Sequence, residues 1–407
     1  MLMDDAPVSQ IAGISSAAIP GEQSVKRTRA EGAWRQSRQE IIRASHRSAD
    51  RVGFYRTTAG ALRRVVPFAG ACWITFDPAT LLFTSHFSDD LPAEGFALLC
   101  KNEYQDEDFN TFAQLTLSPS RVGVLREATG GDLERSPRYR TLLRPFGLEG
   151  ELRASFVSGG SSWGGLILLR AAGEPDFTPE ETAFVRQMSE YIAHGLRTAV
   201  IGTALEDGVE PSPPGLILID AAGAVDAATP AAVQWLEALR GSDPPATGPL
   251  PAAVLAVASR ARRAAHTGDA AATARARAQT VTGQWLVLHG TVLETSAGEQ
   301  VAIIIEPAGP AEIAPLITQG YGLSDREREV TTLVLRGLAT QRIAKQLRLS
   351  PYTVQDHLKS IFQKMGVRSR KELVAHVFFQ HHQPRISRGD ALAAGGWFAP
   401  SEVRAVG

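Results

Sequence analysis

The chain has 407 residues, of which 44% are hydrophobic and 21% charged, and its net charge is −1. This length predicts two to four domains of ordinary size, and the composition is typical of a globular protein with buried cores. No apolar run approaches the roughly 20 residues that cross a bilayer, and the start "MLMDD" lacks the positive charge of a secretory signal. We therefore expect a cytoplasmic protein that contacts no membrane.

The cysteine content excludes two further classes. Cys72 and Cys100 are the only cysteines in the sequence, and their separation is not that of a metal site. Neither a disulfide framework nor a zinc site is predicted, and both thiols are interpreted as small apolar residues of a reduced protein.

The charge is distributed unevenly. The segment 321–383 holds eleven Lys and Arg against five Asp and Glu, a net charge of +6, which leaves −7 for the rest of the chain. A basic segment attached to an acidic body indicates an anionic partner for that segment, although a scattered solvated surface gives the same count.

The first predicted domain covers residues 28–202, after a disordered N-terminus over 1–27. A helical pattern is followed by segments rich in β-branched and aromatic residues, and Thr178, Pro179 and Glu181 mark the start of a closing helix. This order of elements predicts an α+β domain. The strand-like segments cover residues 71–77, 81–87, 150–158 and 163–171.

This domain resembles GAF domains through "GELRASFVSGGSSWGGLILLRAAGEPDFTPEETAFVRQMSEYIAHGLR". The resemblance implies a sensory domain that holds a small-molecule signal between its sheet and its helices, or a dimerising spacer. Aromatic side chains could line such a pocket, but aromatics in strands are more often ordinary core. The residues in question are Trp73, Phe76, Phe83, Phe87 and Phe156.

A second α+β domain is predicted over residues 213–310. "GLILIDAAGAV" indicates a strand, a turn and a strand, two helical segments follow, and residues 274–308 contain three more strands. This part resembles PAS domains through "GLILIDAAGAVDAATPAAVQWL" and "GQWLVLHGTVLE". No ligand follows from either resemblance.

The third predicted domain, residues 316–383, is entirely α-helical with four short helices. Ser324 with Glu327 and Ser369 with Glu372 form capping boxes for the first and the fourth helix, and Ser350 caps the third. The remaining residues, 384–407, are predicted to form a flexible tail.

The third helix of this domain has two distinct faces. Val354, Leu358, Ile361 and Met365 form a stripe to be buried, because they lie within about 40° on a helical wheel. The opposite side is polar. Such a face suits either plain solvent exposure or a helix-turn-helix that reads base edges, since Gln pairs with adenine, Lys with guanine and Asp with cytosine. Its residues are Gln355, Asp356, Lys359 and Gln363.

The segment "GLSDREREVTTLVLRGLATQRIAKQLRLSPYTVQDHLKSIFQKMGVRSRKELVAHV" resembles the LuxR-type helix-turn-helix domain of bacterial transcription regulators. The resemblance implies base contacts from Gln355, Asp356 and Lys359. It implies phosphate contacts from Ser350, Tyr352, Thr353 and Lys364, and a dimerising fourth helix with Val374, Val377 and Phe378.

The same resemblance implies a sequence-specific transcription regulator. Its partners would be double-stranded DNA, a second copy of the chain and RNA polymerase. Thr340 and Arg342 depart from residues common in the family, namely Asn and an acid, which bears on the details of the second helix.

Several alternatives stay open at this stage. The spacing of Gly160, Ser162 and Gly164 mimics a nucleophile elbow, but a strand-like segment follows where the elbow requires a helix, so we expect a hairpin turn and no enzyme. No catalytic, cofactor or metal residues are predicted. A phosphorylated receiver domain near Asp89 and Asp90, and an autoinducer-binding front domain, are minority interpretations. The main rival is a ligand-binding or interaction scaffold whose C-terminal helices contact a protein.

Overall fold

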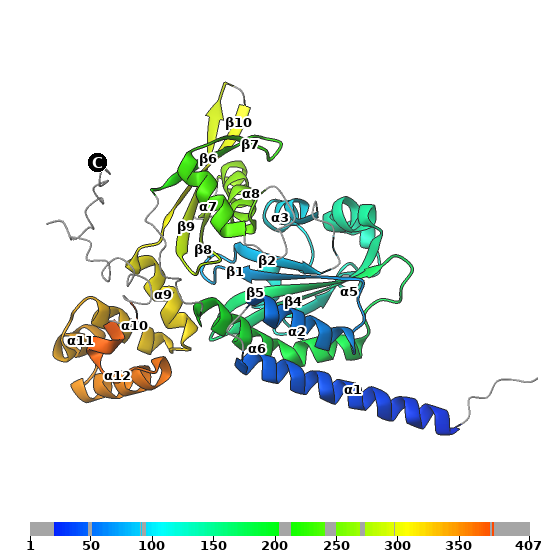
Figure 1. The fold of residues 1–407 in the computed structure, drawn as a ribbon, viewed down its shortest axis with the longest axis horizontal. Coiled ribbons are helices and arrows are strands. Elements are labelled where there is room, and N and C mark those ends of the chain that lie inside the picture. Colours follow the sequence, from blue (N-terminus) through cyan, green and yellow to red (C-terminus); the bar gives the residue numbers. More distant parts are fainter. Residues whose placement is uncertain are drawn as a thin grey trace, which may run out of the picture.

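The structure is a computed structural model that describes residues 20–47, 51–89, 91, 95–202, 213–240, 250–268, 273–296, 298–374 and 377. It shows two five-stranded antiparallel sheets with helices, followed by a helical C-terminal part (Figure 1). The predicted fold class, two α+β units and then an all-α unit, is confirmed. In the described part of the chain, no helix is long and apolar enough to cross a membrane.

The first sheet has the strand order β2-β1-β5-β4-β3. All four predicted strands are present. The β4–β5 hairpin turns at Gly159 and Gly160, whose φ angles of 60° and 78° suit residues without a Cβ. The strands are β1 (Gly70–Phe76), β2 (Phe83–Asp89), β3 (Val122–Val124), β4 (Leu148–Ser158) and β5 (Ser161–Ala171).

The two faces of this sheet have different covers. Helix α6 packs on β4 and β5, and α1 and α2 pack against α6, so one face is buried under helices (Figure 1). The opposite face packs under α3 and α4. The helices are α1 (Pro20–Arg47), α2 (Arg51–Arg63), α3 (Gly95–Gln105), α4 (Phe112–Leu117), α5 (Leu125–Ala128) and α6 (Pro179–Gly202).

The predicted start of α6 is confirmed in detail. The Thr178 backbone N–H donates to Glu181 Oε2 at 2.8 Å, and the Glu181 backbone N–H donates to Thr178 Oγ1 at 3.3 Å. This reciprocal pair satisfies amide groups that have no partner within the helix. Arg170 of β5 also donates to Glu181 at 2.7 Å, which ties the start of the helix to the sheet.

Three features of the first unit differ from the prediction. The disorder predicted over residues 20–27 is wrong, because α1 begins at Pro20, whereas residues 1–19 lie outside the described part. The strand predicted to end at residue 87 continues to Asp89, which pairs with Arg63 at 3.1 Å. Between β2 and β4 the sequence indicated no elements, yet α3, α4, β3 and α5 form there.

The second sheet repeats the order of the first, as β7-β6-β10-β9-β8. Its predicted strands and helices are all present, and α8 packs on β9 and β10. The predicted loop over 241–249 lies outside the described residues. The elements are β6 (Gly215–Ile219), β7 (Val225–Ala228), α7 (Pro230–Arg240), α8 (Ala252–Thr267), β8 (Arg275–Gln279), β9 (Trp285–Thr295) and β10 (Gly298–Pro307).

A connecting helix, α9 (Pro310–Gly320), joins the second sheet to the C-terminal helices (Figure 1). It contacts both α6 of the first unit and α10 of the C-terminal unit. Residues of these parts belong to one continuous apolar cluster, which includes Trp285, Ile313 and Leu316. The C-terminal helices are α10 (Asp325–Leu335), α11 (Thr340–Leu347) and α12 (Pro351–Met365), followed by helical residues 370–374.

Candidate nucleic-acid interface and ligand pocket

The turn between α11 and α12 is fixed by backbone geometry. Arg348 ends α11 with φ 54°, and the next N–H, that of Leu349, donates to the Ala344 carbonyl at 2.8 Å. Ser350 then caps α12, since its Oγ accepts from the Thr353 N–H at 3.0 Å, and Pro351 occupies the first helical position. The two helices are therefore joined by a short, hydrogen-bonded turn.

The buried stripe predicted for α12 is confirmed. Val354 and Ile361 have no exposed surface, and Leu358 and Met365 are 8% and 2% exposed. These residues pack with α10 and α11, which both contact α12. Packing on two helices fixes which side of α12 faces outward.

The opposite side of α12 is exposed. Tyr352 is 80% exposed, and Gln355, Asp356, Lys359 and Gln363 are exposed as well. Lys359 Nζ lies 3.6 Å from Asp356 Oδ1, with both side chains more than three quarters accessible to solvent. A pair of this kind stabilises a helix little, so the ammonium group is free to change partner.

Ser350 and Thr353 lie at the start of α12 beside this face. Their hydroxyl groups are 2.8 Å apart, and Ser350 is exposed while Thr353 is half-buried. The cap uses the Ser350 oxygen as an acceptor, so a hydroxyl proton remains to donate outward.

Lys364 differs from the other predicted DNA contacts. Its Nζ donates to Glu327 Oε2 at 2.6 Å, and Ser360 Oγ donates to Glu327 Oε1 at 2.6 Å. Burial alone would raise the pKa of Glu327, but hydrogen bonds from Lys364, Ser360 and the Ser324 backbone outweigh it and lower the pKa to about 2. Lys364 thus joins α12 to α10 within the domain.

The fourth helix also differs in part from the prediction. Ser369 accepts from the Glu372 N–H at 3.1 Å as expected, but the Glu372 carboxylate accepts from the Arg368 N–H and not from that of Ser369. Val377 is 2% exposed within its own chain, which leaves little of its surface for the predicted contact with a second copy. Val374 is half-buried, and Phe378 lies outside the described residues.

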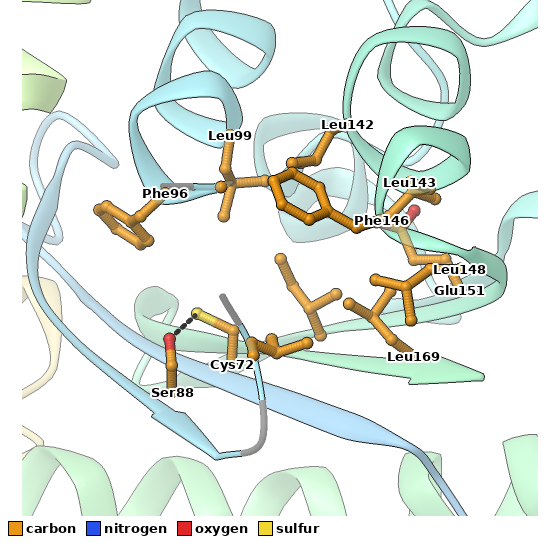
Figure 2. A pocket seen from close by; sticks show the side chains of 13 residues that line it. Cys72, Ser88, Phe96, Leu99, Leu142, Leu143, Phe146, Leu148, Glu151 and Leu169 are labelled. Carbon is orange, nitrogen blue, oxygen red and sulfur yellow. Dashed lines mark hydrogen bonds between the residues drawn. The ribbon is translucent and has the colours of Figure 1, made fainter. Parts of the chain in front are cut away.

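A pocket lies in the first unit, between the sheet and α3. Its volume is about 490 Å³ when its open mouth is counted. Figure 2 shows Phe96, Leu99 and Phe146 across from the sheet, with Cys72 and Ser88 at one end and Glu151 at the other. The lining residues are Cys72, Ser88, Leu91, Gly95, Phe96, Leu99, Leu142, Leu143, Phe146, Leu148, Glu151, Ile167 and Leu169.

None of the five aromatic residues weighed as pocket lining borders this pocket. Trp73, Phe76, Phe83 and Phe156 are buried in the core, and Phe87 is half-buried against Tyr55. The interpretation of these side chains as ordinary core is confirmed for the four buried ones. The residues that do line the pocket come mostly from segments for which no element was predicted.

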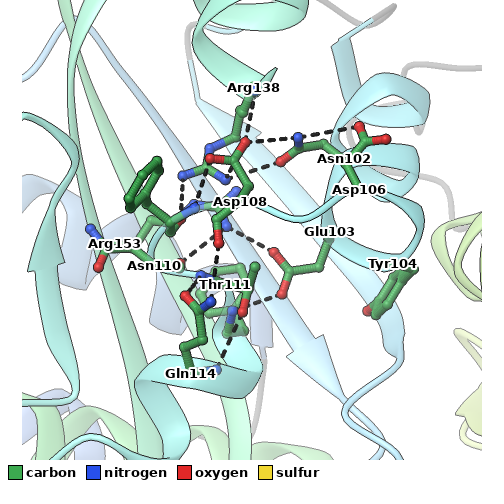
Figure 3. Close-up of polar contacts among 12 residues, drawn as sticks. Asn102, Glu103, Tyr104, Asp106, Asp108, Asn110, Thr111, Gln114, Arg138 and Arg153 are labelled. Carbon is green, nitrogen blue, oxygen red and sulfur yellow. Dashed lines mark hydrogen bonds and ion pairs between the residues drawn. The ribbon is translucent and has the colours of Figure 1, made fainter. Parts of the chain in front are cut away.

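A buried polar network lies next to the pocket (Figure 3). Arg138 has no exposed surface and donates to Glu151 Oε2 at 2.7 Å, to Asn102 Oδ1 at 3.0 Å and to the Phe109 carbonyl at 2.9 Å. Arg153 donates to Glu103 at 2.8 Å and to Glu151 at 3.2 Å. These contacts pair the buried charges, which would be costly to bury alone, while Arg153 Nη2 makes no hydrogen bond.

The expected hairpin at "GGSSWGG" is confirmed. Ser162 lies in β5, is 1% exposed and shares a hydrogen bond of 2.9 Å with Ser155 of β4. The strand continues after it, so the backbone does not form a nucleophile elbow.

The C-terminal geometry defines a helix-turn-helix protein. The family described as "Bacterial regulatory proteins, luxR family" matches residues 322–377. The spore germination protein GerE of Bacillus subtilis is 38% identical over 55 residues, which are 14% of this chain and 74% of GerE. The chain therefore belongs to the LuxR family of bacterial regulatory proteins.

Other similarities cover smaller shares of the compared proteins or are weaker. Mb0914c of Mycobacterium bovis, which is named as an HTH-type transcriptional regulator, is 47% identical over 57 residues. Those residues are 14% of this chain but only 6% of Mb0914c. The VqsR LBD domain from Pseudomonas aeruginosa is 19% identical over 42% of this chain and 97% of its own, with a TM-score of 0.30, which is too low to support a conclusion.

Proposed function

We propose that the protein is a sequence-specific transcription regulator whose α12 reads the major groove of DNA under control of the two front units. The observation that carries this proposal is the exposed face of Gln355, Asp356 and Lys359 on a helix whose other side is fixed by packing. Membership of the LuxR family supports the same function.

The proposed roles follow from side-chain chemistry. Gln355 and Lys359 pair with adenine and guanine edges, and Asp356 accepts from a cytosine amine. Ser350, Tyr352 and Thr353 contact phosphates from the start of the helix, where the backbone amides also favour anions. Lys364 contributes to phosphate binding only by exchanging its Glu327 partner, so its main role is to hold α12 on α10.

Control of α12 by the front units is proposed to pass through α9. Arg277 of β8 holds Asp77, at the end of β1, through contacts of 2.5 and 3.0 Å, and it donates to the Glu312 carbonyl of α9 at 2.9 Å. One guanidinium group thus contacts both front units and the connecting helix. A signal changes DNA affinity through this path only if its binding favours one arrangement of these parts.

Further parts of the proposal rest on the family. We place the protein in the cytoplasm, acting as a homodimer with RNA polymerase as a partner and a small molecule as the signal of the GAF-like unit. A regulator is proposed and not an enzyme. The predicted domain bounds, 28–202, 213–310 and 316–383, belong to the same proposal, as does a tail over 384–407.

The experiment that tests the function is a gel-shift assay of the full chain with mixed genomic fragments at several salt concentrations. Binding should weaken steeply as salt rises, because each neutralised phosphate releases counterions. If no DNA is retained even at low salt, the rival scaffold, in which the helical domain contacts a protein, replaces the proposal.

A further inference from the structure

The pocket beside α3 is lined almost entirely by hydrocarbon. Apart from Cys72, Ser88, Glu151 and Gly95, its wall consists of Leu, Ile and Phe side chains (Figure 2). The space between these side chains, counted with the open mouth, is about 490 Å³. The wall therefore favours a mostly apolar occupant.

The one carboxylate in the wall, that of Glu151, already has its negative charge balanced by neighbouring guanidinium groups. Burial alone would raise the pKa of Glu151, but the guanidinium groups of Arg138 and Arg153 beside it outweigh this and lower the pKa. Arg138 in turn uses its Nε, Nη1 and Nη2 atoms on Glu151, Asn102 and Phe109. A charged occupant would thus meet no unpaired opposite charge in the lining, and burying its charge would be costly.

The other end of the pocket offers an adaptable hydroxyl group. Ser88 Oγ donates to Cys72 Sγ at 3.8 Å, which is a long and weak hydrogen bond. Burial raises the pKa of the Cys72 thiol to about 12, so the sulfur is a neutral thiol and holds the hydroxyl only weakly. Ser88 can therefore turn to an oxygen of an occupant at little cost.

We propose that this pocket binds a neutral, mainly hydrocarbon molecule with a single hydroxyl or carbonyl group, whose oxygen forms a hydrogen bond with Ser88. The inference that this ligand is the signal of the regulator rests on the proposed function. Cys72, which contacts it, lies on β1, and Asp77, which directly follows this strand, holds Arg277. Strand β1 thus connects the pocket wall, through Asp77, to Arg277, which contacts the connecting helix α9.

The charge selectivity is tested with two dyes that share one skeleton. N-phenyl-1-naphthylamine is neutral, and 1-anilinonaphthalene-8-sulfonate is the same molecule with a sulfonate group. The full chain should enhance the fluorescence of the neutral dye with at least tenfold higher affinity than that of the sulfonate. Equal affinities, or binding of the sulfonate alone, would overturn the proposal.

Two variants test whether the neutral dye binds in this pocket. Leu142→Trp fills the space from the pocket wall, and Leu117→Trp adds the same group at a position that is 87% exposed. The first should lower the affinity for the neutral dye at least tenfold, and the second should leave it unchanged. If Leu142→Trp does not fold, as judged by circular dichroism, the milder Leu99→Phe replaces it. Unaltered binding in a folded pocket variant contradicts the site.

The hydrogen bond is tested by competition. 1-Naphthol and 1-methylnaphthalene have nearly the same shape, but only the naphthol carries a hydroxyl group. The naphthol should displace the dye about fivefold better, which is the effect of one hydrogen bond. Ser88→Ala should abolish this preference while dye binding persists. A preference that survives in Ser88→Ala excludes Ser88 as the partner.

These measurements require no DNA. Failure of the dye experiments would contradict the proposed ligand but not DNA binding by α12. Failure of the gel-shift assay would contradict the proposed function but not ligand binding in the pocket.

Discussion

At the scale of single residues, the two ionic contacts of α12 have different purposes. Lys359 and Asp356 pair on the exposed face, whereas Lys364 pairs with the nearly buried Glu327. An exposed pair contributes little to stability and can exchange its partner for DNA. The second pair, with its additional hydrogen bonds to Ser360 and Ser324, holds two helices together.

The exposed pair leads to a prediction about DNA affinity. Lys359→Ala and Gln355→Ala should each weaken binding to a preferred site by about 1 to 3 kcal/mol and change the preferred bases, because each removes a contact to a base edge. Fluorescence anisotropy with specific and random duplexes measures both effects. Lys101→Ala, which removes an equal charge from an exposed position of α3, is the control. Equal losses on both duplexes would contradict base reading.

The inner pair leads to a prediction about pH. The pKa of Glu327 is lowered from 4.5 to about 2, so its stabilisation is complete above about pH 4.5 and is lost as the pH falls towards 2. Glu327→Gln should lower the free energy of unfolding by about 1 to 3 kcal/mol at neutral pH and flatten this acid dependence. Urea unfolding between pH 2 and 6 measures it. An unchanged acid profile in the variant would show that Glu327 is not the responsible group.

At the scale of elements, α9 determines how the C-terminal helices meet the first unit. Gly320 lies so close to α6 that an added Cβ would be 1.5 Å from Ile201 Cδ1. Two residues on, Gly322 has a φ angle of 67°, which favours glycine. The missing Cβ at Gly320 thus lets α9 approach α6 closely, and the contact between the two helices is a defined feature of the fold.

This contact gives a prediction with a built-in control. Gly320→Ala should lower the melting temperature by several degrees, because Ile201 must move or α9 must shift. Ile201→Ala removes the atoms that clash, so the double variant should recover part of the loss. Differential scanning calorimetry of the wild-type protein, the two single variants and the double variant gives the interaction energy between the two positions. Additive effects of the two changes would show that α9 and α6 do not touch there.

Local sequence signals predicted some elements and missed others. The caps at Ser324 and Ser350 were found because each depends on residues only a few positions apart. The pocket was missed because the wall that faces the sheet consists of α3 and of two short helical turns, Tyr139–Leu143 and Arg144–Phe146, which the strand-rich pattern did not indicate. A signal was present, since Phe96, Leu99, Cys100 and Tyr104 follow a helical spacing and are buried.

At the scale of the whole molecule, two sheets of the same strand order are joined by a buried ion pair. Asp77, which follows β1 of the first sheet, and Arg277, in β8 of the second, are 3% and 11% exposed. The sequence could not reveal this contact, because the two residues are 200 positions apart and no local pattern links them. The sequence predicted only that both units are α+β domains, which the two sheets with their helices confirm.

The ion pair yields a prediction about the connection between the units. Arg277→Met should destabilise the protein by about 3 to 5 kcal/mol, because it leaves the Asp77 carboxylate buried without a partner. Asp77→Asn in the same chain should recover part of this loss. Chemical unfolding followed by tryptophan fluorescence and by circular dichroism measures both. If Arg277→Met costs less than about 1 kcal/mol, the pair does not hold the two units together.

The central claim, that α12 reads DNA sequence, is tested most directly by selecting bound duplexes from a random library with the full chain and sequencing them. The wild-type protein should enrich one sequence at physiological salt, and Gln355→Ala should enrich a sequence changed at a defined position in each half-site. Enrichment of no sequence by the wild-type protein, or of the same sequence by both proteins, would contradict the claim.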